Sequence, residues 1–259
     1  MRTFLVLCSA IALATQSASA FPLIDLRVDT TAGGATVDQT LGANEYGPGN
    51  SYQYLGGGSG FGGTVGGGAL YLNSDASNLY VGFQAGNSLN DLVGILFDTV
   101  AGGQTDASMN DNGDGCRKAL TQQAINANDP YDPSFLADYG LCIGNFGTVL
   151  FGPLGATDAN FLAFDGTTSF PFREYAIPLS TLGVSPGGAV NFFVSYSADS
   201  GYGSNESIPA YGPLNSGPNP GFDATSPGYG NYDRFTVVPE PSSLSLLGLG
   251  ALALIRRKR

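Results

Sequence analysis

The chain has 259 residues, of which 39 are glycine, and it carries a formal net charge of -11 with an isoelectric point near 4.1. It contains no histidine, which excludes Ser-His-Asp and Cys-His catalytic centres as well as His-ligated zinc. The acidic charge repels nucleic acid, so we expect no nucleic-acid partner, and the absence of tryptophan removes the commonest platform for stacking on sugars. The many glycines disfavour long helices and predict many strands and turns.

Residues 1–20 are predicted to be a signal peptide. Arg2 provides a positive n-region, residues 4–14 form an apolar h-region that we expect to be a short helix, and small residues precede position 21. This pattern predicts an exported protein and cleavage by signal peptidase. The residues that mark the cleavage site are Ala18, Ala20 and Phe21.

Residues 21–238 are predicted to form one β-rich domain, with 20 acidic and 5 basic residues. A strand at 21–31 opens the domain. The glycine-rich segment 56–68 is predicted to be a surface loop, because it lacks the Lys-Ser/Thr ending of a phosphate-binding loop. Alternating apolar residues over 69–84 predict a hairpin, and the apolar run 91–99 predicts a central strand buried on both faces.

Residues 102–146 break this pattern and are predicted to be a long insertion loop with a short helix at 118–126. Two cysteines remain after removal of the signal peptide, Cys116 and Cys142, and an even pair in an exported chain predicts one disulfide. We expect this disulfide to join the two ends of the loop. Two free thiols are the alternative.

Short strands separated by turns predict an all-β fold, an antiparallel β-sandwich. The stretches "NLYVGFQ", "LVGILFDT" and "REYAIPLSTLG" resemble the core of family-nine carbohydrate-binding modules and DOMON domains. That resemblance implies a jelly-roll or DOMON-like sandwich, but the sugar-clamping tryptophans and haem ligands of those families have no counterpart here. The remaining strands are predicted at 148–152, 160–166, 173–183, 190–198 and 232–238, with a loop at 199–230.

Residues 239–259 combine a Pro-Glu-Pro, an uncharged apolar stretch at 242–255 and four basic residues. As a helix the apolar stretch is about 21 Å long, shorter than the roughly 30 Å hydrocarbon core, so it would span a membrane only marginally. A plain C-terminal anchor is one interpretation. The order of the three features resembles the PEP-CTERM sorting signal of Gram-negative bacteria. The residues that carry the resemblance are Pro239, Glu240, Pro241, Arg256, Arg257, Lys258 and Arg259.

The PEP-CTERM resemblance implies recognition by an exosortase, processing near the Pro-Glu-Pro, and release or attachment at the cell surface. In this interpretation a short transmembrane helix anchors the protein transiently in the inner membrane, with the basic residues on the cytoplasmic side. Many proteins with this signal occur in organisms that make extracellular polysaccharide.

A calcium site is a candidate at Asn110, Asn112 and Asp114, which stand at every second position before a glycine, as in the first half of an EF-hand loop. The position of the bidentate glutamate in such a loop is Thr121, and two basic residues lie close by. A polar, glycine-rich turn is therefore the alternative.

Other polar residues have two interpretations each. Glu174 and Asp165 are candidates for a carboxylate pair that hydrolyses glycosidic bonds, although carboxylates are scattered over the whole chain. Asp98 is either a ligand or a turn-forming cap at the end of a strand. Seven tyrosines in polar, glycine-rich surroundings either stack on sugars or fill the edge of the sandwich: Tyr46, Tyr52, Tyr54, Tyr202, Tyr211, Tyr229 and Tyr232.

We therefore expect an exported, exosortase-sorted, non-catalytic protein of the cell surface or extracellular matrix, associated with exopolysaccharide. One alternative is a carbohydrate-binding module that uses Tyr and Phe platforms, with or without calcium. The other is a glycoside hydrolase that acts through carboxylates alone.

Overall fold

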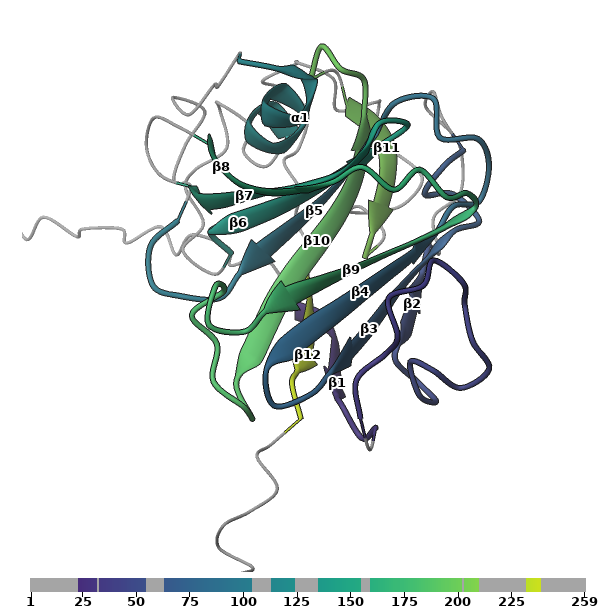
Figure 1. The fold of residues 1–259 in the computed structure, drawn as a ribbon. Coiled ribbons are helices and arrows are strands. Elements are labelled where there is room, and N and C mark those ends of the chain that lie inside the picture. The colour runs from purple at the N-terminus through teal and green to yellow at the C-terminus, as the bar shows by residue number, and fades with distance from the viewer. Residues whose placement is uncertain are drawn as a thin grey trace, which may run out of the picture.

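The computed structural model describes residues 23–31, 33–54, 63–103, 113–123, 135–154, 159–201, 203–209 and 232–238. Over these residues the chain forms two packed β-sheets, with a helix against the outer face of the larger sheet (Figure 1). This arrangement confirms the predicted all-β sandwich.

The larger sheet has eight strands in the order β1-β12-β10-β5-β6-β7-β8, and β11 pairs with the second half of β10. Neighbouring strands are antiparallel except β1 and β12, which run parallel. The strands are β1 (Leu23–Val28), β5 (Leu92–Asp98), β6 (Tyr139–Gly144), β7 (Gly147–Leu154), β8 (Ala159–Asp165), β10 (Ala189–Ser197), β11 (Gly203–Ile208) and β12 (Tyr232–Thr236).

The smaller sheet has four antiparallel strands in the order β2-β3-β4-β9. The predicted hairpin is confirmed as β3 and β4, in which Leu70 pairs with Phe83 and Leu72 pairs with Val81. The strands are β2 (Ser51–Gln53), β3 (Ala69–Ser74), β4 (Asn78–Gln84) and β9 (Phe172–Pro178).

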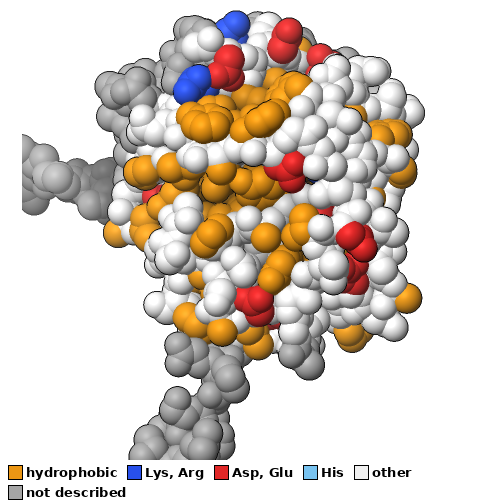
Figure 2. Space-filling view, in the orientation of Figure 1, with side chains coloured by type: hydrophobic (Ala, Val, Ile, Leu, Met, Phe, Trp, Pro, Cys, Tyr) orange, Lys and Arg blue, Asp and Glu red, His pale blue; other side chains and the backbone are white. Residues whose placement is uncertain are grey.

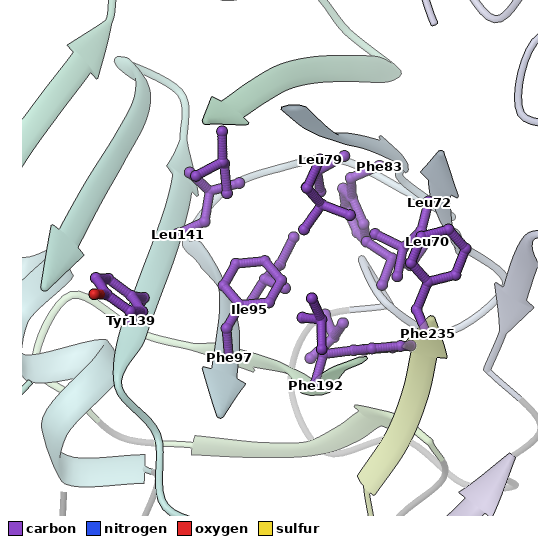
Figure 3. Close-up of a cluster of buried hydrophobic side chains, with 14 of the residues drawn as sticks. Leu70, Leu72, Leu79, Phe83, Ile95, Phe97, Tyr139, Leu141, Phe192 and Phe235 are labelled. Carbon is purple, nitrogen blue, oxygen red and sulfur yellow. The ribbon is translucent and has the colours of Figure 1, made fainter. Parts of the chain in front are cut away.

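The core lies between the two sheets. On β5 every residue from Leu92 to Phe97 is buried, which explains the apolar run in the sequence. Val93, Ile95 and Phe97 face the smaller sheet, while Leu92 and Leu96 belong to a second cluster under the helix α1 (Gly115–Gln123). Figure 3 shows Ile95 and Phe97 in the core together with Leu70, Leu72, Leu79, Phe83, Tyr139, Leu141, Phe192 and Phe235.

The prediction that 102–146 is one insertion loop is wrong over its last part. Strand β6 lies inside this range and pairs with both β5 and β7, so it is an interior strand of the larger sheet. Both faces of β6 are buried, and its sequence, YGLCIG, has no charged residue. The strand therefore lacks the polar and apolar alternation that marks a half-buried strand. The predicted helix is present but begins three residues earlier, at Gly115.

The predicted disulfide is confirmed. Cys116 and Cys142 are bonded, with their Cα atoms 5.7 Å apart. Since Cys142 lies on β6, the bond joins the first turn of α1 to the sheet. The expectation that it joins the two ends of a loop is therefore wrong.

Two other strands were not predicted. β11 lies within the range that was expected to be a loop. Its sequence is polar and gave no strand signal, yet Glu206 and Ser207 are buried. β2 is only three residues long. The expected terminal hydrophobic helices, the signal peptide and the sorting signal lie outside the described residues. Within the described part of the chain, no helix is long and apolar enough to cross a membrane.

Candidate functional site

A groove lies on the outer face of the larger sheet, between strands β7 and β8 and the N-terminal end of α1. Its volume is about 500 Å³. We call it the outer groove. Its lining comprises Asn90, Asp91, Leu92, Asp114, Gly115, Cys116, Asn145, Phe146, Val149, Phe151, Phe161 and Asp199. Figure 2 shows hydrophobic side chains over the region that β6–β8 occupy in Figure 1, next to charged side chains.

The apolar side of the outer groove is formed by phenylalanines. Val149 and Phe151 are buried and form its floor, whereas Phe161 is 56% exposed and Phe146 is 42% exposed. The rings of Phe151 and Phe161 meet edge to face, with their centroids 6.3 Å apart. The groove therefore presents two solvent-accessible aromatic rings on a rigid apolar floor.

An irregularity in strand pairing brings aromatic side chains of β8 to this face. Leu150 pairs with Ala163, but the next residue, Phe151, pairs with Phe161, so Leu162 is an extra residue. Ala163 packs against the inter-sheet core, while Phe161 contacts Phe151 on the opposite face. Such a bulge re-aims side chains at a sheet edge, and here it turns Phe161 outward into the groove.

The other side of the outer groove is acidic and begins at the helix. Asp114 caps α1, because its Oδ1 accepts a hydrogen bond from the Arg117 backbone N at 2.9 Å. Its Oδ2 forms an ion pair with the Arg117 guanidinium. That guanidinium also lies 5.1 Å from the centre of the Phe151 ring, and its Nε donates to the Ala159 carbonyl. Asp114 and Arg117 thus fix the helix end against the groove floor.

Asp91 and Asp199 complete the acidic side. Burial raises the pKa of Asp91, and the negative charge of Asp199 raises it further, while a hydrogen bond from Tyr196 opposes the shift. The backbone N of Asp91 donates to the Tyr196 hydroxyl at 3.0 Å. Asp91 therefore lies in the same groove as the aromatic rings, and its pKa depends on the charge of Asp199.

The disulfide determines how far α1 stands from the sheet. Cys116 lines the groove, and its partner Cys142 is fully buried in β6. Leu120, one turn further along α1, packs on Gly94 and Gly140, where an added Cβ would lie 3.2 Å and 2.7 Å from it. The covalent bond and this close contact hold Asp114 and the N-terminal end of α1 at a fixed distance from the sheet.

The candidate calcium site is only partly described. Asn110 and Asn112 lie outside the described residues. Asp114 is used as a helix cap and as the ion-pair partner of Arg117. Among the residues that the structure places, no group of three or more Cys, Asp or Glu side chains is arranged to hold a metal ion.

Glu174 is enclosed and cannot reach a substrate. It is 1% exposed, and its Oε2 accepts hydrogen bonds from the backbone N atoms of Asp38 and Gln39 at 3.0 and 2.7 Å. Its Oε1 accepts a hydrogen bond from the Tyr46 hydroxyl at 2.7 Å. Asp165 accepts two hydrogen bonds from Thr167 and does not line the groove. The structure therefore does not present the proposed pair to a sugar.

Asp98 also lies away from the outer groove. Its Oδ2 accepts a hydrogen bond from Asn191 Nδ2 at 2.9 Å. Burial, with a contribution from Asp138, raises its pKa to about 6. It serves as a hydrogen-bond partner between β5 and β10.

Among the four candidate tyrosines that the structure describes, three fill the fold. Tyr46, Tyr52 and Tyr232 are buried, and Tyr232 stacks on Phe135 with a centroid distance of 5.6 Å. Tyr54 is half-buried, and Tyr202, Tyr211 and Tyr229 lie outside the described residues. The exposed rings of the groove are phenylalanines. The sequence analysis placed Phe161 in a strand and Phe146 at the end of the insertion loop, and it singled out neither, because the bulge at Leu162 has no sequence signature of its own.

Comparison with known proteins identifies the C-terminal segment. Residues 237–259 match the family model of the PEP-CTERM protein-sorting motif, which confirms the resemblance seen in the sequence. No curated protein matches the chain significantly. The chain is therefore exported and is targeted to an exosortase, in the manner of Gram-negative cell-surface proteins.

Proposed function

We propose that this exported protein is a non-catalytic component of the cell surface or extracellular matrix that binds exopolysaccharide through the outer groove. After transient anchoring through residues 242–255, exosortase processing would release or attach the domain with the groove exposed. The observation that carries the proposal is the presence of Phe161 and Phe146, both exposed, in one groove with Asp91 and Asp199.

The chemistry of the groove suits a sugar. The C–H face of a pyranose ring is apolar and packs on an aromatic ring, while its hydroxyl groups need hydrogen-bond acceptors, which carboxylates supply. The side-chain amides of Asn90 and Asn145 add donors and acceptors at the rim. A volume of about 500 Å³ lies inside the usual range of roughly 300–1,000 Å³ for small-ligand sites.

A direct test is to remove one ring. Stacking of a ligand ring on an aromatic side chain is worth about 1–3 kcal/mol, so Phe161→Ala should weaken binding by roughly 5- to 150-fold. The matched control is Phe170→Ala, since Phe170 is 53% exposed but does not line the groove. Binding is measured by calorimetry or affinity electrophoresis with exopolysaccharide from the producing bacterium. Equal affinities of the two variants would contradict the proposal.

A glycoside hydrolase remains a second candidate because of Asp91. A carboxyl group with a raised pKa next to a second carboxylate is the arrangement that a general acid needs in such enzymes. Release of reducing ends from the same polysaccharide, lost in Asp91→Asn, would support hydrolysis. Binding without release of reducing ends would support the non-catalytic function.

A further inference from the structure

The end of β12 is held by three hydrogen bonds to two other parts of the sandwich, the turn at Gly187 and Gly188 and the end of β3 at Ser74. The Val237 side chain is fully buried, and its backbone N donates to the Gly188 carbonyl at 3.0 Å. The Val238 carbonyl accepts a hydrogen bond from the Gly187 N at 3.1 Å, and the Val238 N donates to Ser74 Oγ at 2.8 Å. We call these contacts the C-terminal clasp.

Asp29 strengthens the clasp from the end of β1, the strand that runs beside β12 in Figure 1. Its buried Oδ2 accepts hydrogen bonds from the Ser74 N at 2.6 Å and from Ser74 Oγ at 2.7 Å. Because the Ser74 hydroxyl donates its hydrogen bond to Asp29, a lone pair of its oxygen is oriented to accept the hydrogen bond from Val238. Asp29 Oδ1 is occupied by hydrogen bonds from Thr31 and Asn50.

The clasp and the sorting motif share residues. The motif match begins at residue 237, so Val237 and Val238 are its first two positions, and Pro239 follows directly in the sequence. An enzyme that acts on a peptide commonly holds it extended, through hydrogen bonds to its backbone N–H and C=O groups. In the closed sandwich the N–H groups of both residues and the Val238 carbonyl already have partners.

We propose that the C-terminal clasp and the exosortase compete for Val237 and Val238, and that opening of the clasp limits the rate of processing. A closed sandwich then withholds Val237 and Val238 from the enzyme. A chain whose β12 end has detached offers the whole motif and is processed faster. Folding of the sandwich thereby delays its own release from the membrane.

An insertion separates the two roles without disturbing the fold. The variant carries Gly-Ser-Gly-Ser-Val-Val between Val238 and Pro239, so the clasp keeps its own valines and a second pair precedes the Pro-Glu-Pro. In cells that contain the exosortase, pulse-chase labelling and intact mass follow conversion of the full-length chain into the processed one. We expect conversion at least severalfold faster than in the unaltered protein. The control places the same six residues between Ala101 and Gly102, both exposed, and should leave the rate unchanged.

A substitution tests the clasp itself. Ser74→Ala removes the acceptor for Val238 and should also accelerate processing, whereas Ser77→Ala in the exposed neighbouring turn should not. If Ser74→Ala fails to fold, the insertion still decides the question. An unchanged rate in the insertion variant would show that recognition begins at Pro239, and a slower rate would show that the sandwich rim assists the enzyme. Either result overturns the proposal.

Discussion

The two sheets cover their outer faces in different ways. Over the smaller sheet lies the segment 33–50, whose Tyr46 packs against Tyr71 and Phe172 with centroid distances of 5.6 and 6.2 Å. Over the larger sheet lies α1, which leaves the outer groove open beside β8. Aromatic side chains are present on both faces, so the presence of such residues does not distinguish a closed face from an open one.

What distinguishes the two faces is the use of their carboxylates. On the smaller sheet, Glu174 satisfies two backbone donors and a tyrosine of the covering segment, and so fastens that segment down. Gly82 helps, because a Cβ there would lie 2.8 Å from the Tyr46 ring and 2.7 Å from Phe172. On the larger sheet, Asp91 and Asp199 face the groove beside exposed rings. We infer that Glu174 serves the fold, and that Asp91 and Asp199 are the carboxylates placed to contact a ligand.

The largest effect is expected from removing the disulfide that shapes the open face. The bond closes a sequence separation of 26 residues, for which the loop-entropy relation gives about 3.5 kcal/mol. Cys116→Ala combined with Cys142→Ala should lower the free energy of unfolding by about that amount and weaken polysaccharide binding, because α1 loses its fixed distance from the sheet. Chemical denaturation measures the first effect and calorimetry the second. A double variant with full stability and full affinity would show that packing of Leu120 alone positions the helix.

A smaller loss of stability, with no loss of binding, is expected at the closed face. Glu174→Gln removes the charge and leaves a buried donor facing other donors, at a cost of about 2–3 kcal/mol. Glu45→Gln is the matched control, since Glu45 also accepts two backbone hydrogen bonds in the same segment but remains partly exposed. In thermal unfolding, the melting temperature of Glu174→Gln should be well below that of Glu45→Gln. Weakened polysaccharide binding by Glu174→Gln below its melting temperature would mean that the two faces are not independent.

The fold could be predicted from the sequence where the burial of a strand leaves a distinct pattern, alternating for one buried face and continuously apolar for two. Alternation over 69–84 gave the hairpin, and the apolar run 91–99 gave the central strand, because these patterns follow directly from which faces are covered. β6 was missed because its sequence, YGLCIG, contains two glycines, as a turn would. Gly140 admits Leu120, and a Cβ on Gly144 would collide with Phe146. The parallel pairing of β1 with β12 joins residues about 200 positions apart, and no local pattern encodes it.

The site was less predictable than the fold. The two cysteines were recognised, but their partner elements were not, since sequence spacing does not say on which strand a cysteine lies. The sequence left two interpretations open for Tyr46, Tyr52 and Tyr232, stacking on sugars or filling the edge of the sandwich, and the structure buries all three. The outer groove depends on a bulge in β8 and on the position of α1, both of which are results of tertiary packing.

The smallest expected effect is on the pH dependence of polysaccharide binding at the open face. Burial and the charge of Asp199 raise the pKa of Asp91, so Asp91 takes up its proton at a higher pH than an ordinary aspartate. If the ionised carboxylate accepts hydrogen bonds from sugar hydroxyls, affinity is full above the pKa and falls as the pH is lowered through it. Asp91→Asn should bind more weakly at neutral pH and show no such dependence.

Asp199→Asn provides the matching measurement, because it removes the neighbouring negative charge and leaves Asp91 in place. The pKa of Asp91 should then move down towards its usual value, and the loss of binding should shift to lower pH. Affinity measured by calorimetry between about pH 3 and pH 7 gives both midpoints. A midpoint that does not move in Asp199→Asn would mean that a different acid governs the dependence. The same titration of Glu174→Gln should match the unaltered protein, since Glu174 lies on the other sheet and makes no contact with the groove.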